Sequence, residues 1–185
     1  EIRQEIPIFY YNIWDDLPYP MWNEPFYESV DLLMNISKQT YNIVKNVRRE
    51  IPVKDWQCTY VPHGINESTF FPVDEKHEQY HEMENWWIDN TGDSSLEFVI
   101  FYNNRNIRRK QPSDIIIAFK HFCDTLPREQ ADKCLLLMHT QPKDPNGPDL
   151  PEIVKQLGGG YKIAFSSKKL EPGKLNWMYN KASVT

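Results

Sequence analysis

The stretch Phe98-Val-Ile-Phe-Tyr-Asn-Asn-Arg105-Asn-Ile-Arg-Arg-Lys110 says more about the fold than any other part of the chain. Its apolar and β-branched start, residues 98–102, is typical of a buried strand. Arg105 and Lys110 follow this strand, and a helical pattern then opens near Ser113. A strand, a cationic loop and a helix N-terminus in this order hold phosphate groups in α/β proteins. A solvated basic turn is the other interpretation, because cations also cluster on surfaces.

The composition limits the classes of protein to consider. With 185 residues, 40% of them apolar and 25% charged, the chain can build a core for one domain or for parts of two. A net charge of −5 argues against a nucleic-acid partner. The sequence has no apolar run of membrane-spanning length, and residues 1–5 lack a signal-peptide pattern. Three widely spaced cysteines (Cys58, Cys123 and Cys134) predict buried, reduced thiols in a cytoplasmic protein.

Strand-like and helix-like patterns alternate along the chain. The strands are expected at residues 6–13, 31–36, 58–61, 98–102, 134–139 and 161–165. The helices are expected at residues 37–50, 113–126, 149–157 and 174–181, and residues 180–185 look like a helix end running into a new strand. Such alternation predicts an α/β fold with parallel sheets and helices on both faces.

His77-Glu78-Gln-Tyr-His81 matches the H-E-x-x-H pattern of zinc hydrolases. On a helix, this spacing places two imidazoles on one face and a carboxylate beside them as a general base. The flanking residues are polar and acidic, which favours a solvated helix without a metal.

Trp14, Asp15 and Asp16 follow the first predicted strand among many aromatic residues. Flat rings beside carboxylates suit a sugar, because its C–H faces stack on the rings and its hydroxyls donate to the acids. A proline-rich loop that packs its rings into a core is the alternative. His139 and Thr140 end another predicted strand, where sites of α/β proteins collect.

Several segments together resemble one known family. Residues 60–72, Tyr-Val-Pro-His-Gly-Ile-Asn-Glu-Ser-Thr-Phe-Phe-Pro, look like the linker between the two domains of GT-B glycosyltransferases, particularly the retaining family-4 enzymes. Arg105 and Lys110 fall at the family's spacing for the Arg and Lys that bind the donor's diphosphate, although Asn104 and Gln111 replace the usual glycines. Residues 115–119, 135–139, 164–166 and 175–184 resemble the helices and strands that follow.

The resemblance implies an α/β fold of the GT-B type, with two Rossmann-like parallel-sheet domains that are each only partly present. Residues 1–62 would be the C-terminal part of the acceptor-side domain and 63–95 the linker with an acidic insertion. Residues 96–185 would be the first half of the nucleotide-sugar-binding domain. We therefore expect a fragment truncated at both ends and inactive alone, because the family's paired glutamates would follow Thr185.

The implied activity is sugar transfer from a nucleotide diphosphate sugar to an unknown acceptor, retaining and without a metal or cofactor. Catalytic residues are not assigned. The resemblance implies that Arg105 and Lys110 bind the diphosphate; the expected nucleotide pocket is Gly64, Thr140, Phe165 and Ser166, and the expected acceptor side is Trp14, Asp15 and Asp16. Two alternatives stay open: a zinc-dependent hydrolase that uses His77, Glu78 and His81, and a non-catalytic nucleotide- or sugar-binding module.

Overall fold

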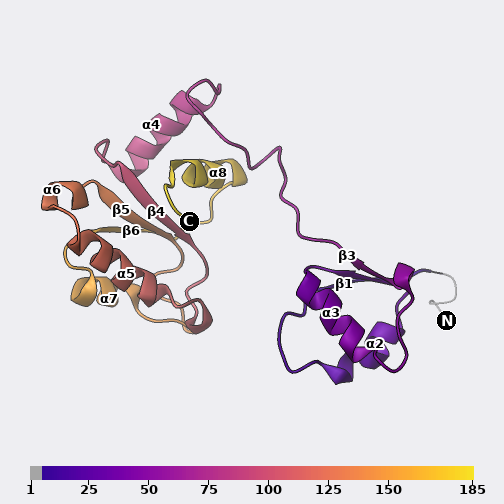
Figure 1. Cartoon of the computed structure of the whole chain (residues 1–185). Helices are drawn as coiled ribbons and strands as arrows, with labels where there is room; N and C mark the ends of the chain where they lie inside the picture. Colours follow the sequence, from indigo (N-terminus) through magenta and orange to yellow (C-terminus); the bar gives the residue numbers. More distant parts are fainter. Residues whose placement is uncertain (1–5) are drawn as a thin grey trace. The chain divides into compact units, whose positions relative to one another are not determined.

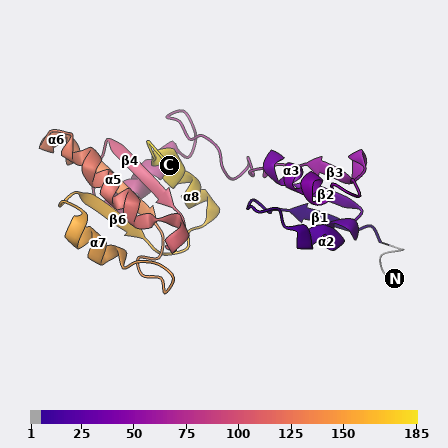
Figure 2. The ribbon, with the colours of Figure 1, turned by 60° about the horizontal axis from the view of Figure 1, so that its bottom comes forward.

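The computed structural model describes residues 6–185 and shows an α/β chain of two compact units (Figures 1 and 2). The first unit extends to Ile65, and the second runs from Asn66 to Thr185. Each unit has a three-stranded parallel sheet with helices packed against it. The predicted α/β fold class, with two units that each contain a parallel sheet, is confirmed. Residues 1–5, for which the sequence predicts no signal peptide, lie outside the described part of the chain.

The first unit has strand order β1-β2-β3, with all strands parallel. Its elements are β1 (Phe9–Asn12), the 3₁₀ helix η1 (Met21–Asn23), α2 (Glu24–Glu28), β2 (Leu32–Asn35), α3 (Lys38–Val47), the 3₁₀ helix η2 (Asp55–Gln57) and β3 (Cys58–Tyr60). The helix α3 begins where the sequence predicts, because the Ser37 hydroxyl accepts the backbone N–H of Thr40 at 3.0 Å.

One face of this sheet is buried and the other is largely open. Leu33 and Cys58 lie opposite each other on the buried face and pack with Val44 of α3 and Tyr27 of α2. Successive residues of a strand point to opposite faces. On the other face, Phe9 of β1 is 60% exposed, and its partner on β2, Leu32, is half-buried. The first unit therefore has its core on one side of the sheet.

Two buried amides connect the three strands of the first unit. The side chains of Asn12 and Asn35 are opposite each other in the register of β1 and β2, and both residues are at most 1% exposed. Asn12 Nδ2 donates to Asn35 Oδ1 at 3.3 Å, and Asn35 Nδ2 donates to the carbonyl of Thr59 on β3 at 3.1 Å. Buried amides need such partners, so this pair ties the sheet together from inside the core.

The second unit has strand order β4-β5-β6, again all parallel. Its elements are α4 (Tyr80–Thr91), β4 (Phe98–Asn103), the 3₁₀ helix η3 (Arg108–Lys110), α5 (Pro112–Asp124), α6 (Arg128–Ala131), β5 (Cys134–His139), α7 (Leu150–Leu157), β6 (Lys162–Ser166) and α8 (Pro172–Lys181). The strand β5 has the bounds that the sequence predicts, because its apolar run is bracketed by polar residues.

Both faces of the second sheet carry a hydrophobic core. Leu136 and Met138 of β5 pack with Ile116 and Phe119 of α5 on one face, beside Leu150 of α7. On the other face, a second cluster joins the sheet to α4 and α8, namely Trp87, Val99, Phe101, Leu135, Leu137 and Met178. Helices cover the middle of this sheet from two sides, as the alternating pattern predicts.

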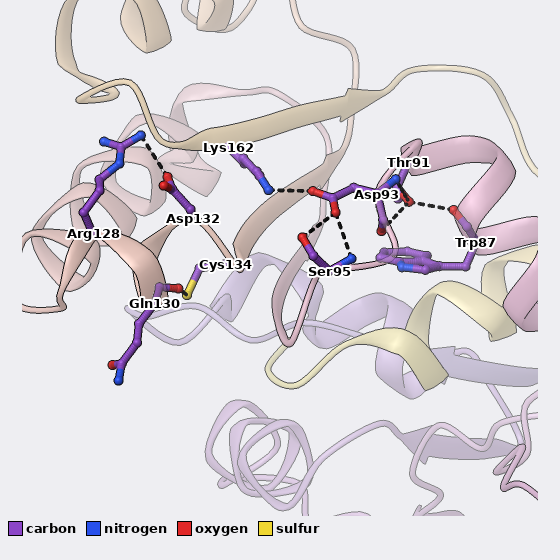
Figure 3. A network of polar contacts seen from close by, with 9 residues as sticks. All are labelled: Trp87, Thr91, Asp93, Ser95, Arg128, Gln130, Asp132, Cys134 and Lys162. Atoms are coloured by element: carbon purple, nitrogen blue, oxygen red, sulfur yellow. Dashed lines mark hydrogen bonds and ion pairs between the residues drawn. The ribbon is translucent and has the colours of Figure 1, made fainter.

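The helix α4 is less solvated than its acidic sequence suggests. Met83 and Trp87, four residues apart on one face, are 2% and 4% exposed. Gly92 ends the helix in a left-handed conformation with φ of 67°. Asp93 then accepts hydrogen bonds from Lys162 of β6 and from the hydroxyl and N–H of Ser95, which together lower the pKa of Asp93 to about 2 (Figure 3). The polar network fastens the end of α4 to the sheet.

The last residues pair with β4 on the side away from β5. Ile100 and Val184 form a parallel bridge, and the N–H of Phe101 donates to the carbonyl of Val184 at 2.8 Å. The order across the sheet is therefore β6, β5, β4 and then Val184, so the first strand of the unit has neighbours on both sides.

The cysteines are buried and unpaired, as predicted, and this holds for Cys58, Cys123 and Cys134. Between residues 6 and 185, none of the helices is long and apolar enough to cross a membrane.

Candidate functional site

The carboxyl ends of β4, β5 and β6 meet at one edge of the second sheet, because the three strands are parallel. A cavity of about 340 Å³ lies at this edge. Its lining comes from all three strand ends and the loops after them: Asn103, Asn104, Arg105, His139, Thr140, Gln141, Ser166, Ser167, Lys168 and Lys169. The cavity is called the strand-end cavity below.

The strand order explains why a site forms here. The chain builds outward from β4 to β5 and β6, and then returns to place Val184 on the other side of β4. Connections on the two sides of β4 thus run in opposite directions, which leaves a crevice beyond its carboxyl end. Asn103, the last residue of β4, lines the cavity, and its amide donates to the hydroxyl of Tyr179 on α8 at 2.8 Å.

Arg105 reaches the cavity and is held by an acidic partner. Its Nε donates to Asp144 Oδ2 at 3.0 Å, and its Nη2 lies 3.5 Å from Asp144 Oδ1. The Arg105 side chain is 64% exposed, whereas that of Asp144 is only 8% exposed. Arg105, followed by the N–H of Asn146, lowers the pKa of Asp144, so the carboxylate stays ionised at neutral pH.

The second part of the site consists of polar side chains, and not all of them have a hydrogen-bond partner among the described residues. His139 Nδ1 and the Ser166 hydroxyl share a hydrogen bond of 2.9 Å between the ends of β5 and β6. Burial lowers the pKa of His139, although a hydrogen bond with the backbone of Ser166 opposes the shift. Thr140 is 8% exposed, and its hydroxyl has no hydrogen-bond partner among the described residues. Hydroxyl and imidazole groups of this kind can bind ligand oxygens or amides.

The edge is also basic. Lys168 and Lys169 follow β6, are exposed and form no ion pair within residues 6–185. With Arg105 they give the strand-end cavity three cations, and in the described part of the chain Arg105 alone among them has an acidic partner. Such an arrangement suits an anion with several oxygens, because Arg offers a planar fork and Lys a mobile point charge.

The structure unites some of the predicted residues. Arg105, Thr140 and Ser166 line the strand-end cavity, whereas Lys110 does not. Lys110 ends η3, is exposed, and accepts the hydroxyl of Tyr102 through its backbone carbonyl at 3.2 Å. The two cations are five positions apart in sequence, but of the two only Arg105 lines this cavity. The following helix α5 begins at Pro112 rather than Ser113, because proline suits the first helical position.

Phe165 and Gly64 lie outside the strand-end cavity. Phe165 alternates with Ser166 along β6 and packs with the core beneath α5 and α7. Gly64 is exposed and belongs to the first unit. A larger cavity of about 740 Å³ lies over the face of the second sheet beside α4, with Trp87, Leu137 and Ala164 in its lining.

The aromatic loop predicted for the acceptor side lies in the first unit. Asp15 and Asp16 are exposed, and Trp14 packs edge-on against Trp22 with ring centroids 5.8 Å apart. The loop is ordered by backbone contacts: Trp14 Nε1 donates to the carbonyl of Asp16 at 2.9 Å, and Gln39 Nε2 donates to that of Asp15 at 3.0 Å. Both carboxylates therefore stand beside an aromatic pair on the surface.

The histidine motif does not form the helical pair that zinc hydrolases use. The helix α4 begins at Tyr80, so His77 lies in the preceding turn, where its ring stacks on Phe71 at 5.2 Å. His81 is exposed on the first turn of α4. Within residues 6–185, no group of three or more His, Cys, Asp or Glu side chains is arranged to hold a metal ion.

Several contributors to the site carry no motif. Asp144, Lys168 and Lys169 lie in polar loops after β5 and β6, and only their position just beyond predicted strands could have marked them. Asn106 is fully buried between two loops, a position that a polar residue in a basic stretch does not suggest.

Comparisons with known proteins show little. No protein-family model matches the sequence, and no curated protein does. Among solved structures, the S. aureus MnaA–UDP co-structure resembles this chain with a TM-score of 0.43 and 14% sequence identity. The match covers 97% of this chain and 44% of that chain, so the present chain spans less than half of its length. A likeness this weak carries no inference about function.

Proposed function

We propose that this chain belongs to a glycosyltransferase and that the strand-end cavity binds the diphosphate of its nucleotide-sugar donor. One observation carries the proposal: Arg105 lies just beyond the carboxyl end of β4, in a cavity that Lys168 and Lys169 also line. Phosphates of nucleotides bind at this position in doubly wound sheets.

The proposed chemistry places the cations next to the bond that breaks. As the bond between the sugar and the diphosphate breaks and the sugar passes to the acceptor, negative charge grows on the departing diphosphate. Arg105 neutralises that charge in this role, and Lys168 and Lys169 add two further donors from the loop after β6. The resemblance to retaining, metal-independent enzymes supports a donor diphosphate held by cationic side chains alone.

The neighbouring polar groups suit the nucleotide. Within residues 6–185 the Thr140 hydroxyl has no hydrogen-bond partner, and the His139–Ser166 pair lies between the same strand ends. In the proposed complex these groups contact the ribose or the base. Trp14, Asp15 and Asp16 remain the proposed acceptor side, since rings beside carboxylates suit a sugar.

The experiment is titration calorimetry of this chain with UDP, GDP and ADP, each compared with its nucleoside. We expect one diphosphate to bind, its nucleoside to bind more weakly, and Arg105→Ala to lower diphosphate affinity about tenfold or more. Arg128→Ala is the matched control, because Arg128 precedes the opposite, amino end of β5 and pairs with Asp132. Equal effects of the two variants, or no preference for diphosphates, would contradict the proposal.

A second assay separates a transferase from a binding module without turnover. The protein is incubated with a nucleotide sugar and acceptor sugars, and a transferase is expected to release the nucleoside diphosphate.

A further inference from the structure

The loop after β5 is fastened to the loop after β4 at several points. Asn106 is fully buried, and its Nδ2 donates to the carbonyls of Pro142 and Pro148 at 3.2 and 2.9 Å. The N–H of Arg108 donates to the carbonyl of Asn146 at 3.1 Å. These bonds bracket Asp144, so the position of its carboxylate is set by the chain on both sides.

Asp144 is also held from within its own loop. Its Oδ1 accepts the N–H of Asn146 at 2.9 Å and the Asn146 side-chain amide at 3.4 Å. Its carbonyl accepts the N–H of Gly147 at 3.0 Å. The carboxylate is thus buried and fixed, while the guanidinium of Arg105 projects toward solvent.

The contact leaves part of the guanidinium available. Arg105 has five N–H donors, and Asp144 engages only the edge formed by Nε and Nη2. The remaining donors can face the strand-end cavity, which Arg105 lines. A buried carboxylate that grips one edge of an arginine orients its other edge.

We propose that Asp144 is a positioning residue, which aims Arg105 at the bound diphosphate from a loop pinned by Asn106. The inference rests on the proposed function, because it takes the diphosphate as the ligand of Arg105. Two effects of Asp144 oppose each other. Its charge repels the ligand, whereas its grip removes the rotamer freedom that Arg105 must otherwise lose on binding. The restriction of Arg105 outweighs the repulsion of the ligand in this proposal.

The direction in which Asp144→Asn changes the affinity for the diphosphate distinguishes the two effects. Asp144→Asn removes a negative charge beside the cavity, which by electrostatics alone strengthens anion binding. If positioning dominates, affinity for the nucleoside diphosphate that the wild-type chain binds instead falls about fivefold, as expected from losing one well-placed ion pair. Affinity for the nucleoside stays unchanged.

Asp149→Asn is the matched control. It removes the same charge from the same loop, but Asp149 pairs with Lys143 at 2.6 Å and caps α7, a cap that Asn also provides. We expect no loss of diphosphate affinity in this variant. Gly147→Ala tests the loop without any change of charge, because an added Cβ would lie 2.3 Å from the carbonyl oxygen of Asn106. It should weaken diphosphate binding in the same direction as Asp144→Asn.

An NMR readout examines the positioning without a ligand. The Nε–Hε signal of Arg105, assigned by its loss in Arg105→Lys, should be sharp in the wild-type chain and in Asp149→Asn, and broadened in Asp144→Asn. A mobile Arg105 in the wild-type chain, or higher diphosphate affinity in Asp144→Asn, overturns the inference while diphosphate binding itself stands. A fixed Arg105 in a chain that binds no nucleoside diphosphate overturns the proposed function, and the inference with it.

Discussion

In the first unit, α3 and α2 bury one face of the sheet, and Phe9 on the other face is 60% exposed. In the second unit, helices lie on both faces, and residues such as Phe101 and Leu136 are almost fully buried. The ion pairs are also distributed unequally between the units. Within residues 6–185, Arg48 and Glu28 form the one ion pair of the first unit, and the other ion pairs lie in the second.

The buried side chains that join the strands also differ in chemistry between the two sheets. The first sheet is joined by the buried amides of Asn12 and Asn35, whereas the second is joined by apolar side chains. Both sheets have the same parallel topology, so backbone pairing alone does not decide how firmly a strand end is placed. The second unit can present charged groups at its strand ends, because burial on two faces holds the strands that carry them.

The largest expected effect tests the apolar core of the second unit. Leu136→Ala removes a fully buried side chain from the middle of β5 and should lower the free energy of unfolding of that unit by about 3 kcal/mol. Chemical denaturation measures the loss, and amide hydrogen exchange locates it. Leu157→Ala, at a position 44% exposed on α7, should change stability by less than about 0.5 kcal/mol. Equal loss of protection in β1–β3 would show that the two units unfold together.

The next effect concerns the polar core of the first unit. Asn35→Ala removes one of the two acceptors of the Asn12 amide, which keeps only Tyr27, and also removes the bond to Thr59, so it should cost about 2 kcal/mol. Hydrogen exchange should rise in β1–β3 and not in β4–β6. Asn42→Ala, exposed on α3, is the control for loss of an amide. A change as small as that of the control would mean that the amide pair does not hold the first sheet together.

The smallest effect is electrostatic and depends on pH. The pKa of Asp93 is depressed to about 2 from 3.8, chiefly by Lys162, so its contribution to stability is complete above about pH 4. It is lost as the pH falls toward 2. The stability difference between the wild-type chain and Asp93→Asn should therefore shrink over this range. Asp89→Asn, an exposed position on α4, should show no such trend, and a trend equal to that of Asp93→Asn would rule out the ion pair as its source.

The elements that the sequence predicts correctly are those that one local pattern determines. An unbroken apolar run bounded by polar residues defines β5, and a serine before a helical pattern defines the start of α3. Arg105 was placed at the end of a strand for the same reason, since the strand itself was clear.

The remainder depends on contacts between distant residues. Asp144 meets Arg105 across 39 positions, and Asn106 meets Pro148 across 42, in loops whose polar residues show no periodicity. The sequence predicts Lys110 in the same site as Arg105, but Lys110 ends a 3₁₀ turn and does not line the strand-end cavity. Local spacing cannot report such turns, because several backbone paths join the same two residues.

The buried pair Asn12 and Asn35 has a consequence for how the sequence can diverge. A slip of one residue between β1 and β2 would place Asn35 on the opposite face and leave Asn12 facing the apolar Met34. The two amides therefore specify a single register of β1 and β2. A mutation at either position leaves its partner without a match, while a joint change to two apolar residues restores a compatible core. In related sequences the two positions should consequently covary, and one of them should rarely change alone.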